Sequence, residues 1–171
     1  MVGIVLASGL LGMVPWPTTH YGQRMRGEEL WVARSFPNYR LTVEITRLQR
    51  VCVQELDVRN DKAQVVNDTC DISWLSSMTI ERLFEMSAWM EHAPDCYPSS
   101  RNCPCQRVRL GHITYDPQLG YPREIVWQRE IQANVDHPDF WRQLWNDRSL
   151  PQCNTSVFPI RLAVLSLEPI P

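Results

Sequence analysis

Six cysteines constrain what this chain can fold into more than any other feature of its sequence. All of them lie between Cys52 and Cys153. An even number of cysteines is typical of proteins that fold in an oxidising compartment, where thiols pair. We therefore predict structural disulfides and a location outside the cytosol. The predicted disulfide residues are Cys52, Cys70, Cys96, Cys103, Cys105 and Cys153.

The positions of these cysteines suggest part of the pairing. Cys52 falls on a predicted strand and Cys70 just after the strand that would pair with it. A bridge between the two would fasten this hairpin to the segment that enters the next helix. The other four cysteines would tie a Pro-rich loop at 94–104 to itself and to the C-terminal part of the chain, with their pairing left open, because long loops gain most from cross-linking.

Two alternatives would use the same cysteines differently. A zinc site would take the loop cysteines together with one histidine, although the usual Cys-x-x-Cys pairs are absent. Its candidate ligands are Cys96, Cys103, Cys105 and either His92 or His112. A redox-active thiol pair is the other alternative, but no Cys-x-x-Cys stands at a helix N-terminus, where the pKa of a thiol falls. We favour structural disulfides and predict no metal.

The N-terminus is apolar. Val2–Val14 carries no charge and is followed by Trp16 between two prolines, which suits a membrane interface. The run is shorter than the roughly 20 residues of a spanning helix, and it lacks the basic start of a secretory signal. We predict that residues 1–17 form an apolar membrane-associated segment with Trp16 as a candidate partner contact. A start site further upstream, or packing against a partner's helices, would account for its length.

The rest of the chain is expected to form one domain, because the hydrophobic content of 44% and the charged content of 21% are close to those of soluble globular proteins. Residues 18–38 are interpreted as a tether with a short helix near 28–34. Residues 39–171 are interpreted as a single α+β domain. Alternation of apolar and polar residues predicts strands at 39–48, 51–58 and 63–67, the last two forming a hairpin.

The second half of the domain is expected to add a helix and another hairpin. Thr79 is a plausible N-cap for a helix to residue 91, and strands at 107–115 and 123–131 flank a turn. A short helix would open at His137, and 160–167 is a candidate last strand. We predict an α+β fold with a small antiparallel sheet of about four to five strands, one main helix on one face, disulfide-linked loops and a C-terminal extension over 132–171.

Three short elements stand in a characteristic order. They are Phe36–Arg40 entering a strand, the helix start Thr79–Phe84, and Tyr115-Asp116-Pro117-Gln118-Leu119-Gly120-Tyr121-Pro122. Together they resemble a family of domains of unknown function that occurs in bacterial exported and lipid-anchored proteins, over about residues 39–131. The resemblance implies a small antiparallel sheet with one helix and an extracytoplasmic location, and it supplies no established catalytic residues to carry over to this chain. The chain departs from that pattern in the insertion at 94–105, in its C-terminal extension and in having no lipid-attachment cysteine near its start.

Charge and motifs exclude several classes of function. The formal net charge is -2 and the basic residues are scattered, so the electrostatic footprint of a nucleic-acid binder is missing. No motif for a nucleophile, a phosphate loop or a haem occurs. The histidines are far apart in the sequence, at His20, His92, His112 and His137. We predict that the protein is not an enzyme and carries no cofactor.

These features favour a non-catalytic accessory subunit of a bacterial membrane protein complex, such as a respiratory or photosynthetic one, on the periplasmic or outer side. It would contact other protein subunits, and its N-terminus would contact the membrane. Trp141 and Trp145, four residues apart on a predicted helix, are candidate partner contacts, although core packing is the favoured role for such aromatics. The alternatives are a free-standing membrane-tethered binding domain for a small ligand or peptide, and a thiol-redox or zinc-binding protein.

Overall fold

The computed structural model describes residues 20–70, 77–153, 155–156 and 158–171. Its helices are α1 (His20–Val32), α2 (Ile80–Met90) and α3 (Pro138–Asp147). Its strands are β1 (Tyr39–Arg47), β2 (Arg50–Arg59), β3 (Lys62–Asp68), β4 (Asp95–Ser99), β5 (Asn102–Tyr115), β6 (Pro122–Ala133), β7 (Thr155–Ser156) and β8 (Ile160–Pro169).

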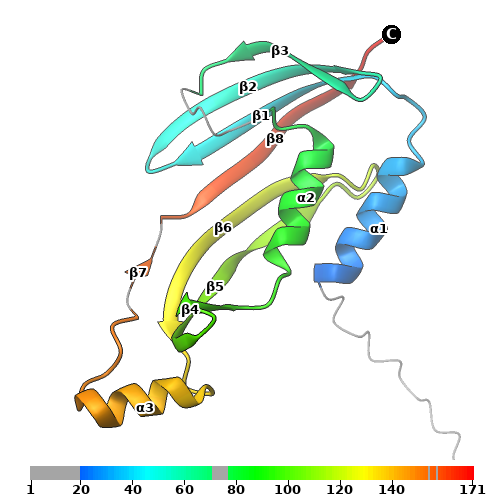
Figure 1. Ribbon diagram of the computed structural model, residues 1–171. Helices are drawn as coiled ribbons and strands as arrows, with labels where there is room; N and C mark the ends of the chain where they lie inside the picture. The colour runs from blue at the N-terminus through cyan, green and yellow to red at the C-terminus, as the bar shows by residue number, and fades with distance from the viewer. Residues whose placement is uncertain (1–19, 71–76, 154, 157) are drawn as a thin grey trace, which may run out of the picture.

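All strands belong to one antiparallel sheet. Seven of them follow in the order β3-β2-β1-β8-β6-β5-β4, and the short β7 also pairs with β6 (Figure 1). β8 pairs with the whole of β1, from Tyr39 against Pro169 to Arg47 against Ile160. It also pairs with residues 124–127 of β6. β8 is therefore the strand that joins the N-terminal hairpins to the later β5–β6 hairpin.

The predicted fold class was wrong in its size and in its helices. We expected about four to five strands with one main helix, whereas the described chain has a sheet of seven principal strands and three helices. Two assignments account for the larger sheet and for α3. β4 forms inside the segment predicted to be a loop, where Asp95 pairs with Arg107. The segment predicted to be a C-terminal extension supplies α3 and the central strand β8. The six individually predicted strands are all present.

The core lies between the sheet and the helices α1 and α2. On β1 the alternating residues Tyr39, Leu41, Val43 and Ile45 are buried, as the period of two predicts. α2 covers them with Ile80, Leu83 and Phe84. The predicted N-cap is confirmed, because Thr79 Oγ1 accepts a hydrogen bond from the backbone N–H of Arg82.

α1 occupies most of the segment interpreted as a tether. Trp31 near its end is only 4% exposed and meets the rings of Tyr39 and Tyr121 edge-on, at centroid distances of 5.3 and 6.1 Å. Its Nε1 donates a hydrogen bond to Glu81 at the start of α2, at 3.2 Å. Arg24 adds a charged contact to Glu91 at the other end of α2. α1 is therefore packed against the domain along its length.

The N-terminal segment lies outside the described residues. The predicted membrane-associated stretch at 1–17, with Trp16, is part of it. Within the described ranges, no helix combines the length and the apolar character that crossing a bilayer requires.

Candidate functional site

All six cysteines form disulfides, so the prediction of structural bridges is confirmed. Cys52 pairs with Cys70, as the hairpin argument suggested. The two other bridges are Cys96–Cys103, which links β4 to β5, and Cys105–Cys153, which links β5 to the segment before β7. The Pro-rich segment is thus tied both to itself and to the C-terminal part of the chain. These bridges make the β4–β5 end of the sheet the most heavily cross-linked part of the molecule.

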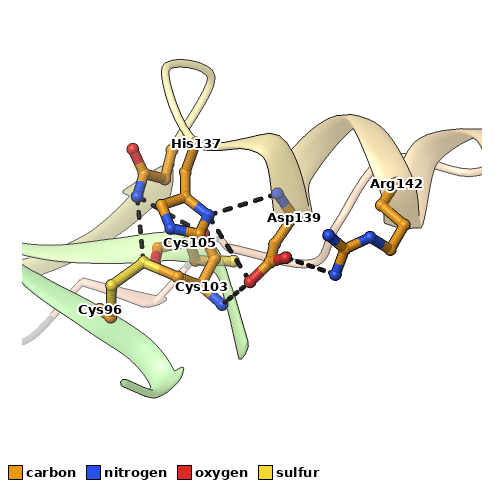
Figure 2. Close-up of polar contacts among 7 residues, drawn as sticks. Cys96, Cys103, Cys105, His137, Asp139 and Arg142 are labelled. Atoms are coloured by element: carbon orange, nitrogen blue, oxygen red, sulfur yellow. Dashed lines mark hydrogen bonds and ion pairs between the residues drawn. A yellow bond between two sulfur atoms is a disulfide. The ribbon is translucent and has the colours of Figure 1, made fainter. Parts of the chain in front are cut away.

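α3 is anchored to this end through Asp139. The carboxylate oxygen Oδ2 of Asp139 accepts a hydrogen bond from the backbone N–H of Cys103 at 3.0 Å, and Oδ1 accepts one from Arg142 at 2.8 Å (Figure 2). His137 caps the helix, because its Nδ1 accepts a hydrogen bond from the backbone N–H of Asp139 at 3.3 Å. The first turn of α3 is therefore fixed to a buried disulfide cysteine.

One histidine lies beside the Cys96–Cys103 bridge. The two sulfur atoms and a ring nitrogen of His137 lie within 4.8 Å of one another. The zinc alternative named His92 and His112 instead, and neither belongs to this group. His92 Nδ1 contacts carbonyl oxygens at the end of α2, and His112 lies 3.9 Å from Glu124. Cysteine binds a metal as a thiolate, so these three residues could hold a metal together only after the disulfide is reduced.

The outward face of α3 carries exposed aromatic side chains. Trp141 is 45% exposed and Trp145 is 75% exposed, so the favoured role of core packing was wrong for both. Phe140, the residue before Trp141, is buried, and its ring meets that of Trp141 edge-on at 5.2 Å. Trp141 Nε1 donates a hydrogen bond to the backbone oxygen of Val135 at 2.8 Å. The helix therefore holds one tryptophan in a defined position at the surface and presents the other to solvent.

Shifted pKa values occur mainly in the core and in ion pairs between strands. Burial raises the pKa of Tyr115 to about 12. Burial, and then the charge of Glu81, raises the pKa of Tyr39. On the sheet surface, the hydrogen bond from Arg40 lowers the pKa of Asp57. Each shift follows from packing or from a cross-strand pair, and none of these groups belongs to the cluster around His137.

Comparison with known proteins found no match to a family model, to a curated protein or to a solved structure. The resemblance to domains of bacterial exported proteins stays a prediction.

Proposed function

We propose that this protein is a non-catalytic accessory subunit of a bacterial membrane complex, placed on the extracytoplasmic side, and that α3 docks against another protein subunit. The disulfides support a location in an oxidising compartment. The apolar run at 2–14 supports contact with a membrane or with the membrane part of a partner. The contact that would stabilise the complex is made by the exposed tryptophans of α3.

The observation that carries this proposal is the combination of exposed tryptophans with a rigid support. Tryptophan is enriched among the residues that dominate the binding energy of protein interfaces. A surface that is already ordered loses less conformational entropy when it binds. α3 meets that condition, because Asp139 binds the backbone of Cys103 and Cys105 is bridged to Cys153 on the following segment. Val135, shortly before the helix, and Leu150, shortly after it, also have exposed apolar side chains.

Copurification of the full chain from detergent-solubilised membranes tests the proposal with the variant Trp145→Ala. We expect the partner subunit to copurify with the unchanged chain, and its affinity for the variant to fall roughly thirtyfold or more, because a central tryptophan contributes about 2 kcal/mol or more to an interface. Trp145 has an exposed side chain, so its removal should leave the fold intact.

The matched control is Tyr21→Ala, which removes an exposed aromatic side chain from α1 instead of α3. It should retain the partner. Equal retention of the partner by both variants, or a chain that is isolated alone under every extraction condition, would contradict the proposed role of α3.

The two alternatives stay predictions. A tethered binding domain for a small ligand or peptide would use a pocket rather than α3. A thiol-redox or zinc-binding protein would need the Cys96–Cys103 bridge to open beside His137.

A further inference from the structure

Arginines gather on the helix-covered face of the sheet, next to the C-terminal end of α2. Arg109 of β5 and Arg129 of β6 lie directly opposite each other in the strand register. Directly opposed side chains in an antiparallel pair share one face and lie close together, and like charges placed this way are destabilising. Arg107 of β5, two residues from Arg109, is on the same face. The fold thus brings three positive charges together.

A tryptophan holds two of these arginines. The guanidinium carbon of Arg109 lies 4.6 Å from the centroid of the Trp89 ring, and that of Arg129 lies 5.4 Å from it. The ring of Trp89 is in turn packed edge-on against Trp127 at 5.0 Å. Contacts between a cation and an aromatic face orient guanidinium groups without neutralising their charge. Trp89 therefore positions the arginines but leaves their mutual repulsion in place.

The negative charge near these three arginines does not balance their positive charge. Arg109 donates to Asp95 at 2.7 Å and to the backbone oxygens of His92 and Ala93 at the end of α2. Among the described residues, Arg107 and Arg129 form no ion pair. One carboxylate therefore faces three guanidinium groups.

Arg109 also has a hydrogen-bond donor without an acceptor. Its side chain is 10% exposed, and its buried Nε has no hydrogen-bond partner within the described part of the protein. A buried charged donor without a partner costs free energy. An external acceptor at this place would remove that cost.

The same residues line a small pocket. Its volume is about 190 Å³, and its lining consists of Trp89, Asp95, Arg107, Arg109 and Arg129. Pockets for drug-sized molecules usually have volumes of roughly 300 to 1,000 Å³, so this one suits a single ionic group. Guanidinium groups bind oxyanions through paired, charge-assisted hydrogen bonds, and they match phosphate geometry especially well.

From this arrangement we infer that the pocket between α2, β5 and β6 is a binding site for a phosphate-type oxyanion. The anion is held by Arg107, Arg109 and Arg129, and it relieves the repulsion between the two opposed arginines. The site involves none of the α3 residues on which the proposed docking depends, so it adds a ligand to the accessory role. The phosphate can belong to a soluble compound or to a lipid headgroup, and both present the same chemistry to the pocket.

Titration of the oxidised full chain with inorganic phosphate tests the site, with sodium chloride at equal ionic strength as the reference. Calorimetry should detect phosphate binding, and the melting temperature should rise with phosphate but not with chloride. The variant Arg129→Gln should weaken phosphate affinity roughly tenfold or more, since a hydrogen bond to a charged group contributes enough for such a change. Arg129 is exposed, and it forms no ion pair with any residue that the structure describes, so the variant should fold.

Arg101→Gln is the matched control, because it removes the same charge from an exposed position in the turn between β4 and β5. It should bind phosphate as the unchanged chain does. A response to phosphate no larger than that to chloride, or equal affinities of the Arg129→Gln and Arg101→Gln proteins, would overturn the inference.

Vesicles distinguish the two sources of phosphate. The full chain is sedimented with vesicles of phosphatidylcholine alone and of phosphatidylcholine with phosphatidylglycerol. Extra binding to the anionic vesicles that Arg129→Gln loses identifies a headgroup phosphate. Phosphate binding in solution without that extra binding identifies a soluble ligand. Extra binding to anionic vesicles that persists in Arg129→Gln, with no phosphate binding in solution, would contradict the site.

Discussion

Gly120 meets two separate requirements at the turn between β5 and β6. Its φ is 76°, in the left-handed region that side chains disfavour, and a Cβ added there would lie 2.3 Å from the backbone oxygen of Gly27 on α1. The second requirement is visible only in the structure, because Gly27 is far from Gly120 in the sequence. We expect Gly120→Ala to lower the free energy of unfolding by about 2 to 4 kcal/mol, because strain and overpacking add. Urea unfolding of the oxidised protein measures this.

Gly22→Ala is the matched control, since Gly22 is an exposed residue of α1. Alanine favours a helix over glycine by about 1 kcal/mol, so this variant should be as stable as the unchanged chain or slightly more stable. If Gly120→Ala unfolded at the same urea concentration as the unchanged chain, α1 could not pack so closely against the turn.

At the scale of elements, α1 shows how a segment whose sequence only weakly predicts a buried helix becomes part of the core. Its sequence contains two glycines and many polar residues, and on this basis it was interpreted as a tether. Trp31 nevertheless fills a site among Phe36, Tyr39 and Tyr121 and reaches Glu81 on α2. We expect Trp31→Ala to cost about 3 to 5 kcal/mol of unfolding free energy, as for other buried aromatic residues. Thermal and urea unfolding give this value.

The neighbouring residue Val32 gives a control from the same turn of the helix. It is exposed, and Val32→Ala should change stability by less than about 0.5 kcal/mol. A loss of stability for Trp31→Ala as small as that for Val32→Ala would mean that α1 is a tether in solution.

At the scale of the whole molecule, the disulfides connect parts of the chain that are far apart in sequence. Cys105–Cys153 spans 48 residues, whereas Cys96–Cys103 spans 7. A bridge stabilises mainly by restricting the unfolded chain, and its effect grows with the loop that it closes. Replacing both cysteines of a pair by serine should therefore cost about 4 kcal/mol for the long bridge and about 2 kcal/mol for the short one. Urea unfolding of the two double variants measures the difference.

The order of the two costs is the critical outcome, because the variants remove the same atoms from neighbouring positions. A larger loss for the short bridge than for the long one would show that the bridges stabilise the protein through local contacts in the folded state. Mass spectrometry of the intact variants should confirm that the remaining bridges are formed.

The sequence by itself determined the features that depend on a few neighbouring residues. Alternation of apolar residues located β1, β2, β3, β5, β6 and β8 but not β4 or β7. Thr79 located the start of α2, and the cysteine positions suggested the Cys52–Cys70 bridge. These features can be recognised in the sequence because each depends on residues that are close together along the chain. For the candidate site, the sequence singled out the cysteines and the two tryptophans of α3, but it assigned the tryptophans to the core.

The tertiary structure decided which of these elements meet. β8 pairs with β1 across about 120 residues of chain and also with β6, and this non-local pairing joins the strands β1–β3 and β4–β6 into one sheet. His137 came to lie beside Cys103, and Arg109 came to face Arg129 under the ring of Trp89, for the same reason. No local sequence pattern predicts these contacts, because they depend on strand register and on helix placement. Both are set by the burial of the whole core.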